Sequence, residues 1–331
     1  MRAVSKRYNI TEETFESISS YWLDPQYPLK WDCFFVLPGW LKVWWQEFGA
    51  DSSLYLHSVK QGDDLIGIAP LLVNDESAFF IGSPDVCDYL DFVVTPGREQ
   101  DFFDSLLDNL DQQGITRLDL RTLRPDSTVN NYLEDAARNR GCEVSFHPDG
   151  VSFELDLPST WEEYLQILKG KHRHETRRKL RRLHEAADIN YRVFEEVDEV
   201  KGIMGTFLEL FRESREDKTV FMTTRMESFF NSLVLAMAEI KVLRLCILEL
   251  DAQPVATVLC FDYNGTLYLY NSGYDPLFRS LSVGLLCKIL NIKDSIQRGI
   301  KRYDFLKGEE TYKYRLGGQE VPLSRCEILL A

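Results

Sequence analysis

The segment Tyr303–Arg315, YDFLKGEETYKYR, brings together side chains that can move protons and hold negative charge. Asp304 lies among apolar residues, where burial would raise the pKa of its carboxyl group toward a range useful for a general base. Tyr312 carries a phenol that can donate a proton, and Lys313 carries an ammonium group that can neutralise a phosphate or a carboxylate. The structural alternative is a buried strand that leads into an edge strand of alternating aromatic and charged residues.

A second candidate is a loop that leads into a helix. Arg279, Ser282 and Gly284 have the spacing R-x-x-S-x-G at the start of an apolar-periodic segment. The first N–H groups of a helix lack intrahelical partners and the helix dipole is positive there, so small residues let a phosphate approach closely. The spacing indicates a pyrophosphate site made by Arg279, Ser280, Leu281, Ser282, Val283 and Gly284. An ordinary loop with a serine cap is the other interpretation.

Two charged segments are candidates for binding an acceptor substrate. Asp88, Tyr89 and Asp91 could hold a cationic or hydroxylated group, or they could form a solvated turn. Residues 169–182 hold eight Lys/Arg against one Glu, and Arg173 and Arg177 share one stripe at helical spacing. This basic helix could bind an anionic acceptor, a nucleotide-linked sugar, an RNA end or the phosphates of a donor. It could also pair with the acidic first half of the chain.

The composition limits the classes of partner. The net charge is −14, and residues 1–150 hold 12 Lys/Arg against 25 Asp/Glu, a net of −13, which argues against a DNA partner. The seven cysteines are scattered without a C-x-x-C pair, as expected for reduced thiols in a cytoplasmic protein. The five histidines have no ligand spacing, so no metal site is expected. No signal peptide or membrane span is expected either.

An internal repeat assigns elements to both halves of the chain. Residues 54–69 and 243–258 each read as a β-hairpin, and helical periodicity recurs at 99–113 and 283–298. Each half therefore reads as strand–strand–strand–helix–strand, which predicts an α+β unit made twice. A turn-rich boundary near Pro148-Asp149-Gly150 divides the chain into two expected domains, 1–150 and 151–331.

The repeat also separates shared residues from unique ones. Gly114–Leu120 aligns with Gly299–Phe305, so Asp119 is the counterpart of Asp304, and a shared structural role is the simpler account of both aspartates. The first copy lacks the R-x-x-S-x-G loop, and it has no counterpart of Tyr312 or Lys313. Any donor site is therefore expected in the second copy.

The order of elements and the loop resemble the GNAT fold of acyl-CoA N-acyltransferases. The tandem arrangement is similar to Fem-type peptidyltransferases and most resembles CelD-type acetyltransferase-domain proteins linked to polysaccharide biosynthesis. The resemblance is carried by FFVLPGWLKVWWQEFG, DLIGIAPLL, CDYLDFVV, KHRHETRRKLRRL, LYLYNSGYDPLFRSLSVGLLC and YDFLKGEETYKYRLG. It implies two tandem GNAT-like domains packed side by side, the second of which carries the cofactor loop.

The resemblance also implies a reaction. Acetyl-CoA or another acyl-CoA would be the donor, with its pantetheine arm along the strand of Tyr268 and Tyr270 and with Asp275 on the donor side of the cleft. Transfer to an amine then needs a base, an oxyanion donor and a proton for the thiolate, for which Tyr312 is the candidate. The acceptor is expected to be an amino group on a sugar-linked or small molecule. Aminoacyl-tRNA as donor and a non-catalytic role in polysaccharide synthesis are the alternatives.

Overall fold

The computed structural model describes residues 8–330, which form two compact units. Unit 1 runs to Gly150 and takes in the chain again from Val321, and unit 2 is Val151–Glu320. The sequence placed residues 321–331 in the second domain instead. Residues 321–330 belong with the first unit because the last strand pairs antiparallel with a strand of unit 1, with Cys326 opposite Leu120. Residues 148–150 do not form the expected turn, because they lie within one continuous strand, β7 (Glu143–Asp156).

Unit 1 is a mixed sheet with helices. Its strand order is β1-β2-β3-β4-β6-β13, and the short strand β5 pairs with β3. The strands are β1 (Asn9–Glu12), β2 (Ser53–Gln61), β3 (Asp64–Asn74), β4 (Ser77–Phe80), β5 (Val93–Val94), β6 (Arg117–Leu123) and β13 (Gln319–Leu329). The helices are α1 (Phe15–Leu23), α2 (Pro38–Phe48), α3 (Glu99–Gln112) and α4 (Glu134–Asn139), with short turns η1 (Phe34–Val36), η2 (Gly49–Asp51) and η3 (Val129–Leu133).

Unit 2 has the strand order β7-β12-β11-β10-β9-β8. The strands are β7 (Glu143–Asp156), β8 (Ile189–Phe194), β9 (Leu243–Leu250), β10 (Gln253–Tyr263), β11 (Thr266–Tyr274) and β12 (Arg302–Lys307). The helices are α5 (Trp161–Ile167), α6 (Gly170–Ala186), α7 (Val197–Glu213), α8 (Glu216–Phe221), α9 (Thr224–Glu239), η4 (Pro276–Leu281), α10 (Val283–Gln297) and α11 (Thr311–Arg315).

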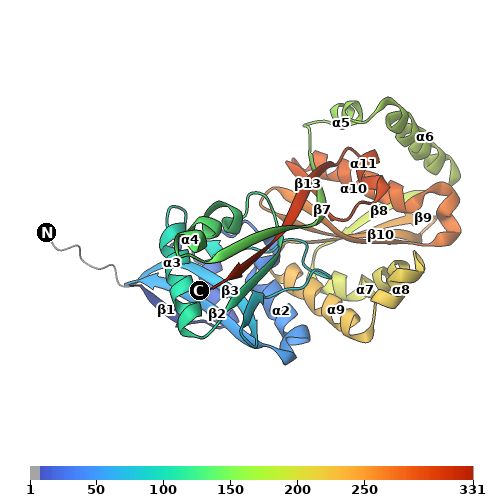
Figure 1. Cartoon of the computed structure of the whole chain (residues 1–331). Coiled ribbons are helices and arrows are strands. Elements are labelled where there is room, and N and C mark those ends of the chain that lie inside the picture. The colour runs from blue at the N-terminus through green and yellow to red at the C-terminus, as the bar shows by residue number, and fades with distance from the viewer. Residues whose placement is uncertain (1–7, 331) are drawn as a thin grey trace. The chain divides into compact units, whose positions relative to one another are not determined.

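Helices cover both faces of the sheet in unit 2 (Figure 1). Figure 1 shows α5, α6, α10 and α11 on one face, and α7, α8 and α9 on the other. The amphipathic pattern explains this placement, since α7 buries Val200, Met204, Phe207 and Phe211 at helical spacing. Strands β9 and β10, covered on both faces, read as near-continuous apolar runs. Among residues 8–330, no helix is both long enough and apolar enough to cross a membrane.

The internal repeat is confirmed by the register of the strands. Each unit has an antiparallel hairpin, β2–β3 in one and β9–β10 in the other. Each also has a parallel strand pair of three residues, and the last pairs are Phe79 with Asp119 and Tyr268 with Asp304. The two aligned aspartates thus occupy the same position in both units, and the α+β fold made twice is confirmed. One local expectation fails, because residues 311–315 form the short helix α11 rather than an edge strand.

Candidate functional site

Strands β11 and β12 run in parallel for three residue pairs and then part. The last pair is Tyr268 with Asp304, whereas β11 continues to Tyr274. On its other edge β11 stays paired with β10, with an irregularity that leaves Tyr270 without an opposite residue. Because a bulge bends a strand and increases its twist, this one turns the end of β11 away from β12. Among residues 8–330, no strand pairs with that edge of β11 beyond Tyr268.

Helix α7 supports β11 from one face at very short range. A Cβ atom added to Gly273 would lie 2.4 Å from the carbonyl carbon of Leu210 and 2.4 Å from the backbone nitrogen of Phe211. Only glycine permits this approach, so the sequence NSGY fixes how closely the helix lies against the strand. The approach also places α8, which follows α7, beside the end of β11, where Lys218 donates a hydrogen bond to the carbonyl oxygen of Ser272.

The loop after β11 leads into α10 as the sequence predicts. Asp275 is buried and its Oδ1 accepts a hydrogen bond of 2.8 Å from the Leu277 N–H, which starts the turn η4. Ser282 precedes α10 with a left-handed backbone, φ 61°, and its side chain makes no capping bond. Its hydroxyl instead accepts a hydrogen bond of 2.7 Å from Lys179 Nζ on α6. The ordinary serine cap is therefore ruled out.

Exposure along this loop varies in a way that suits an anion site. Arg279 and Ser280 are exposed, Leu281 is partly buried, and Val283 is buried in the first turn of α10. Gly284 lies against Tyr274, and a Cβ added there would be 2.8 Å from the tyrosine ring. The small residue thus lets the start of the helix lie close to β11.

The side chains of Asp304 and Lys313 both form hydrogen bonds with nearby backbone groups. Asp304 is 1% exposed, and its Oδ1 accepts a hydrogen bond of 2.7 Å from the N–H of Leu306, which has a left-handed φ of 62°. Lys313 is also 1% exposed, and its Nζ donates to the carbonyl oxygens of Leu306 and Lys307 at 2.9 and 2.7 Å. The Glu310 carboxylate also forms an ion pair with Lys313 Nζ at 2.9 Å. Both side chains therefore hold the turn after β12.

Tyr312 and the two tyrosines of β11 lie in apolar surroundings. Tyr312 is partly buried against the unit 2 core, and burial raises the pKa of its phenol well above the usual value. Its ring centroid is 4.9 Å from Lys288 Nζ. Tyr268 is buried, and the Tyr270 ring stacks on Phe230 of α9 at 5.7 Å.

Two lysines that the sequence analysis did not single out lie near this region, Lys218, which is partly buried, and Lys288, which is buried. Burial, followed by the positive charges of Lys288 and Arg215, lowers the pKa of Lys218 to about 7, against the opposing effect of Asp217 and Glu310. Burial also lowers the pKa of Lys288 to about 8. Lys288 lies on the apolar face of α10 and donates to the Gly284 carbonyl oxygen at 3.3 Å. Lysines that lose their proton near neutral pH can act in proton transfer.

The candidates of residues 88–91 lie in unit 1. Tyr89 is buried and the Arg124 guanidinium lies 4.9 Å from its ring centroid, while Asp88 is partly buried. Burial raises the pKa of Asp91 to about 6, although its carboxylate accepts hydrogen bonds from the Thr128 N–H and hydroxyl. Asp91 thus ties two segments of unit 1 together, and acceptor binding by these residues stays a prediction.

The basic helix is α6, and its arginines differ in their contacts. Arg173 donates to the side chain of Gln166 at 2.9 Å, and Arg177 is exposed. Lys179, on the same helix, reaches the loop through Ser282. Helix α6 is therefore joined to the start of α10 within unit 2.

Comparison with known proteins agrees with this arrangement. Residues 170–314 match the family model described as Acetyltransferase (GNAT) domain. This segment includes β11, the loop, α10, β12 and nearly all of α11, and it has the GNAT-type acyltransferase fold. No curated protein sequence matches the chain.

Solved structures resemble the whole chain. The crystal structure of FemX has a TM-score of 0.63 at 11% identity and covers 96% of each chain. The C-terminal domain of a putative lysylphosphatidylglycerol synthetase from Agrobacterium fabrum has a TM-score of 0.58 at 10% identity, covering 87% of this chain and 86% of its own. L-PGS from Bacillus licheniformis has a TM-score of 0.53 at 10% identity, covering 88% and 90%. At these identities the likeness shows the fold.

Proposed function

We propose that unit 2 is an acyl-CoA-dependent N-acyltransferase, with acetyl-CoA as the simplest donor and an amino group on a sugar-linked or small molecule as the acceptor. The observation that carries the proposal is the parting of β11 from β12 beside the start of α10. A strand edge without a neighbouring strand offers N–H groups to a pantetheine amide and to a developing oxyanion. The adjacent helix start offers N–H groups and a positive dipole to a pyrophosphate. The family match over residues 170–314 supports the same class of reaction.

Lys218 is our candidate for the general base. Its amine donates to the Ser272 carbonyl at the end of β11 and is largely neutral above pH 7. In the reaction, the acceptor nitrogen forms a bond to the acyl carbon and gives its proton to Lys218, while the carbon–sulfur bond breaks. The groups that set the charge around Lys218 are Lys288, Arg215, Asp217 and Glu310.

The proton for the leaving thiolate is better supplied by Lys288 than by Tyr312. The phenol has a pKa raised by burial, so proton transfer from it to a thiolate is unfavourable. The Lys288 ammonium has a pKa of about 8, close to that of a thiol, and it lies over the same ring. We assign Tyr312 to hydrogen bonding in the site, and Asp304 and Lys313 to the support of the β12 turn.

A second donor class, aminoacyl-tRNA, is favoured by one observation. Arg177 and Arg182 on α6 are exposed, and neither has a carboxylate partner among residues 8–330. Such cations suit an RNA backbone. A non-catalytic role in polysaccharide synthesis is the remaining alternative.

Calorimetric titration with acetyl-CoA separates these functions. The wild-type protein is expected to bind, and Arg279→Glu to weaken binding by about tenfold or more, because a cation near the phosphates becomes an anion. Lys201→Glu on α7 makes the same charge change at an exposed site, where Lys201 pairs with Asp198 at 3.7 Å, and this variant is expected to bind as the wild type does. Absence of acetyl-CoA binding to the wild-type protein would refute the proposal and favour the other two functions.

A further inference from the structure

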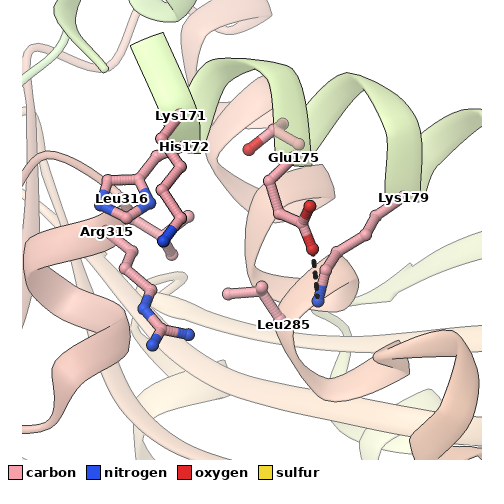
Figure 2. A pocket seen from close by; sticks show the side chains of 8 residues that line it. Lys171, His172, Glu175, Lys179, Leu285, Arg315 and Leu316 are labelled. Carbon is pink, nitrogen blue, oxygen red and sulfur yellow. Dashed lines mark ion pairs between the residues drawn. The ribbon is translucent and has the colours of Figure 1, made fainter. Parts of the chain in front are cut away.

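A pocket of about 240 Å³ lies in unit 2 between the basic helix α6, the start of α10 and the end of α11. Figure 2 shows Lys171, His172 and Arg315 at one side of it, and Glu175 and Lys179 at the other. Leu285, from the first turn of α10, forms part of its apolar lining. The proposed chemistry at β11 uses none of these side chains.

The pocket has more positive than negative charge. Lys171 and Arg315 are exposed, and neither has a carboxylate or hydrogen-bond partner among residues 8–330. Glu175 is the one carboxylate of the lining, and it is already held by Arg178 at 2.9 Å and by Lys179 at 3.7 Å. Two cations therefore face the pocket without compensation, and a group with two negative charges would complement them.

The pocket is joined to the donor loop. Lys179 lines the pocket, and its Nζ also donates a hydrogen bond of 2.7 Å to the hydroxyl of Ser282 in the loop. Leu285 follows Gly284 directly, so the pocket begins next to the N–H groups expected to receive the pyrophosphate. A ligand bound at the start of α10 could thus place a second phosphate among Lys171, Lys179 and Arg315.

We infer that this pocket binds a phosphate monoester of the donor nucleotide, the 3′-phosphate when the donor is acyl-CoA, separately from the pyrophosphate at the start of α10. The inference rests on the proposed function and adds a second phosphate site to it. A phosphate monoester is close to a dianion at neutral pH and has three oxygens for the lysine and arginine donors. Its role is affinity and selection of the donor, since the pocket holds none of the reacting groups proposed above.

The test compares acetyl-CoA with 3′-dephospho-acetyl-CoA by titration calorimetry at low salt. The wild-type protein is expected to bind acetyl-CoA about tenfold more tightly, and Lys171→Ala combined with Arg315→Ala is expected to remove that preference while the affinity for the dephosphorylated donor stays the same. Arg181→Ala is the matched control: it removes an exposed cation from α6 outside the pocket lining, where Arg181 pairs with Glu185, and it should keep the preference. Raising the salt concentration should shrink the preference in the wild-type protein.

Three outcomes would overturn the inference. Equal affinities of the wild-type protein for the two donors would refute phosphate binding in this pocket, but they would remain consistent with the acyl-CoA function. Failure of both donors to bind would remove the function as well. A preference that survives in the Lys171/Arg315 double variant, together with loss of binding to a short single-stranded RNA, would assign the pocket to RNA instead.

Discussion

The close approach of α7 to β11 at Gly273 leads to our most quantitative prediction. An added Cβ would lie 2.4 Å from two backbone atoms of α7 and 2.5 Å from a third, the carbonyl oxygen of Leu210. These atoms belong to a helix and cannot rotate away as a flexible side chain could. Gly273→Ala therefore has to separate the helix from the strand.

The size of the effect follows from this geometry. Overpacking a well-packed interior costs typically 1–3 kcal/mol, and contact with backbone places Gly273→Ala near the upper value, about 3 kcal/mol. For a protein unit of this size, about 3 kcal/mol corresponds to a fall in Tm of roughly 6–12 °C. Because β11 moves with its Ser272 carbonyl, the contact with Lys218 should loosen and acetyl-CoA should bind less tightly.

The same helix supplies a control for the same change of residue. Gly205 is exposed in the middle of α7, and an added Cβ there would meet nothing within 4 Å. Gly205→Ala should therefore stabilise the protein by about 1 kcal/mol, since alanine favours the helix interior. Thermal unfolding followed by circular dichroism measures both variants. Equal Tm values for the two variants would refute the packing of α7 on β11.

Three further predictions concern charged side chains that are buried or partly buried. Lys313→Ala should cost about 3 kcal/mol in urea unfolding, because two carbonyl oxygens lose a charged donor; an unchanged midpoint would contradict this. Asp91 has a folded pKa of about 6 against about 4 unfolded, so stability should fall as pH rises through that window, and Asp91→Asn should flatten the slope. Turnover of acetyl-CoA with an amino-sugar acceptor should rise with pH through about 7, and Lys218→Met should lower it about 100-fold and abolish that limb.

Local patterns in the sequence predicted most of the elements. The hairpins, the helices at 99–112 and 283–297, and the alignment of Asp119 with Asp304 all follow from periodicity and the repeat. The helix at 311–315 was missed because five residues are too few for a helical period to appear. The pairing of β13 with β6 was missed for a different reason. Strand partners that are distant in sequence are determined by packing rather than by a local pattern.

The candidate site was predicted less completely than the fold. The loop from Arg279 to Gly284 was found from its spacing, and it does open a helix. Lys313 looked available for catalysis, but its partners are backbone carbonyls that no residue pattern specifies. The sequence does contain a signal for Lys288. It lies four residues from both Gly284 and Ile292, and this helical spacing predicts that Lys288 shares the apolar face of α10. Lys218 left no such signal, because the charged segment around it is typical of an exposed surface. Its partial burial arises only when α8 folds beside β11.

The central claim is that a donor binds to unit 2 along the unpaired edge of β11 and at the start of α10. Hydrogen–deuterium exchange with and without saturating acetyl-CoA tests it most directly, because backbone N–H groups that bind the donor become protected. The account predicts protection in residues 269–274 and 283–286, with no change in the corresponding elements of unit 1, β4 and the start of α3. Protection confined to unit 1, or no protection anywhere at saturating donor, would contradict it.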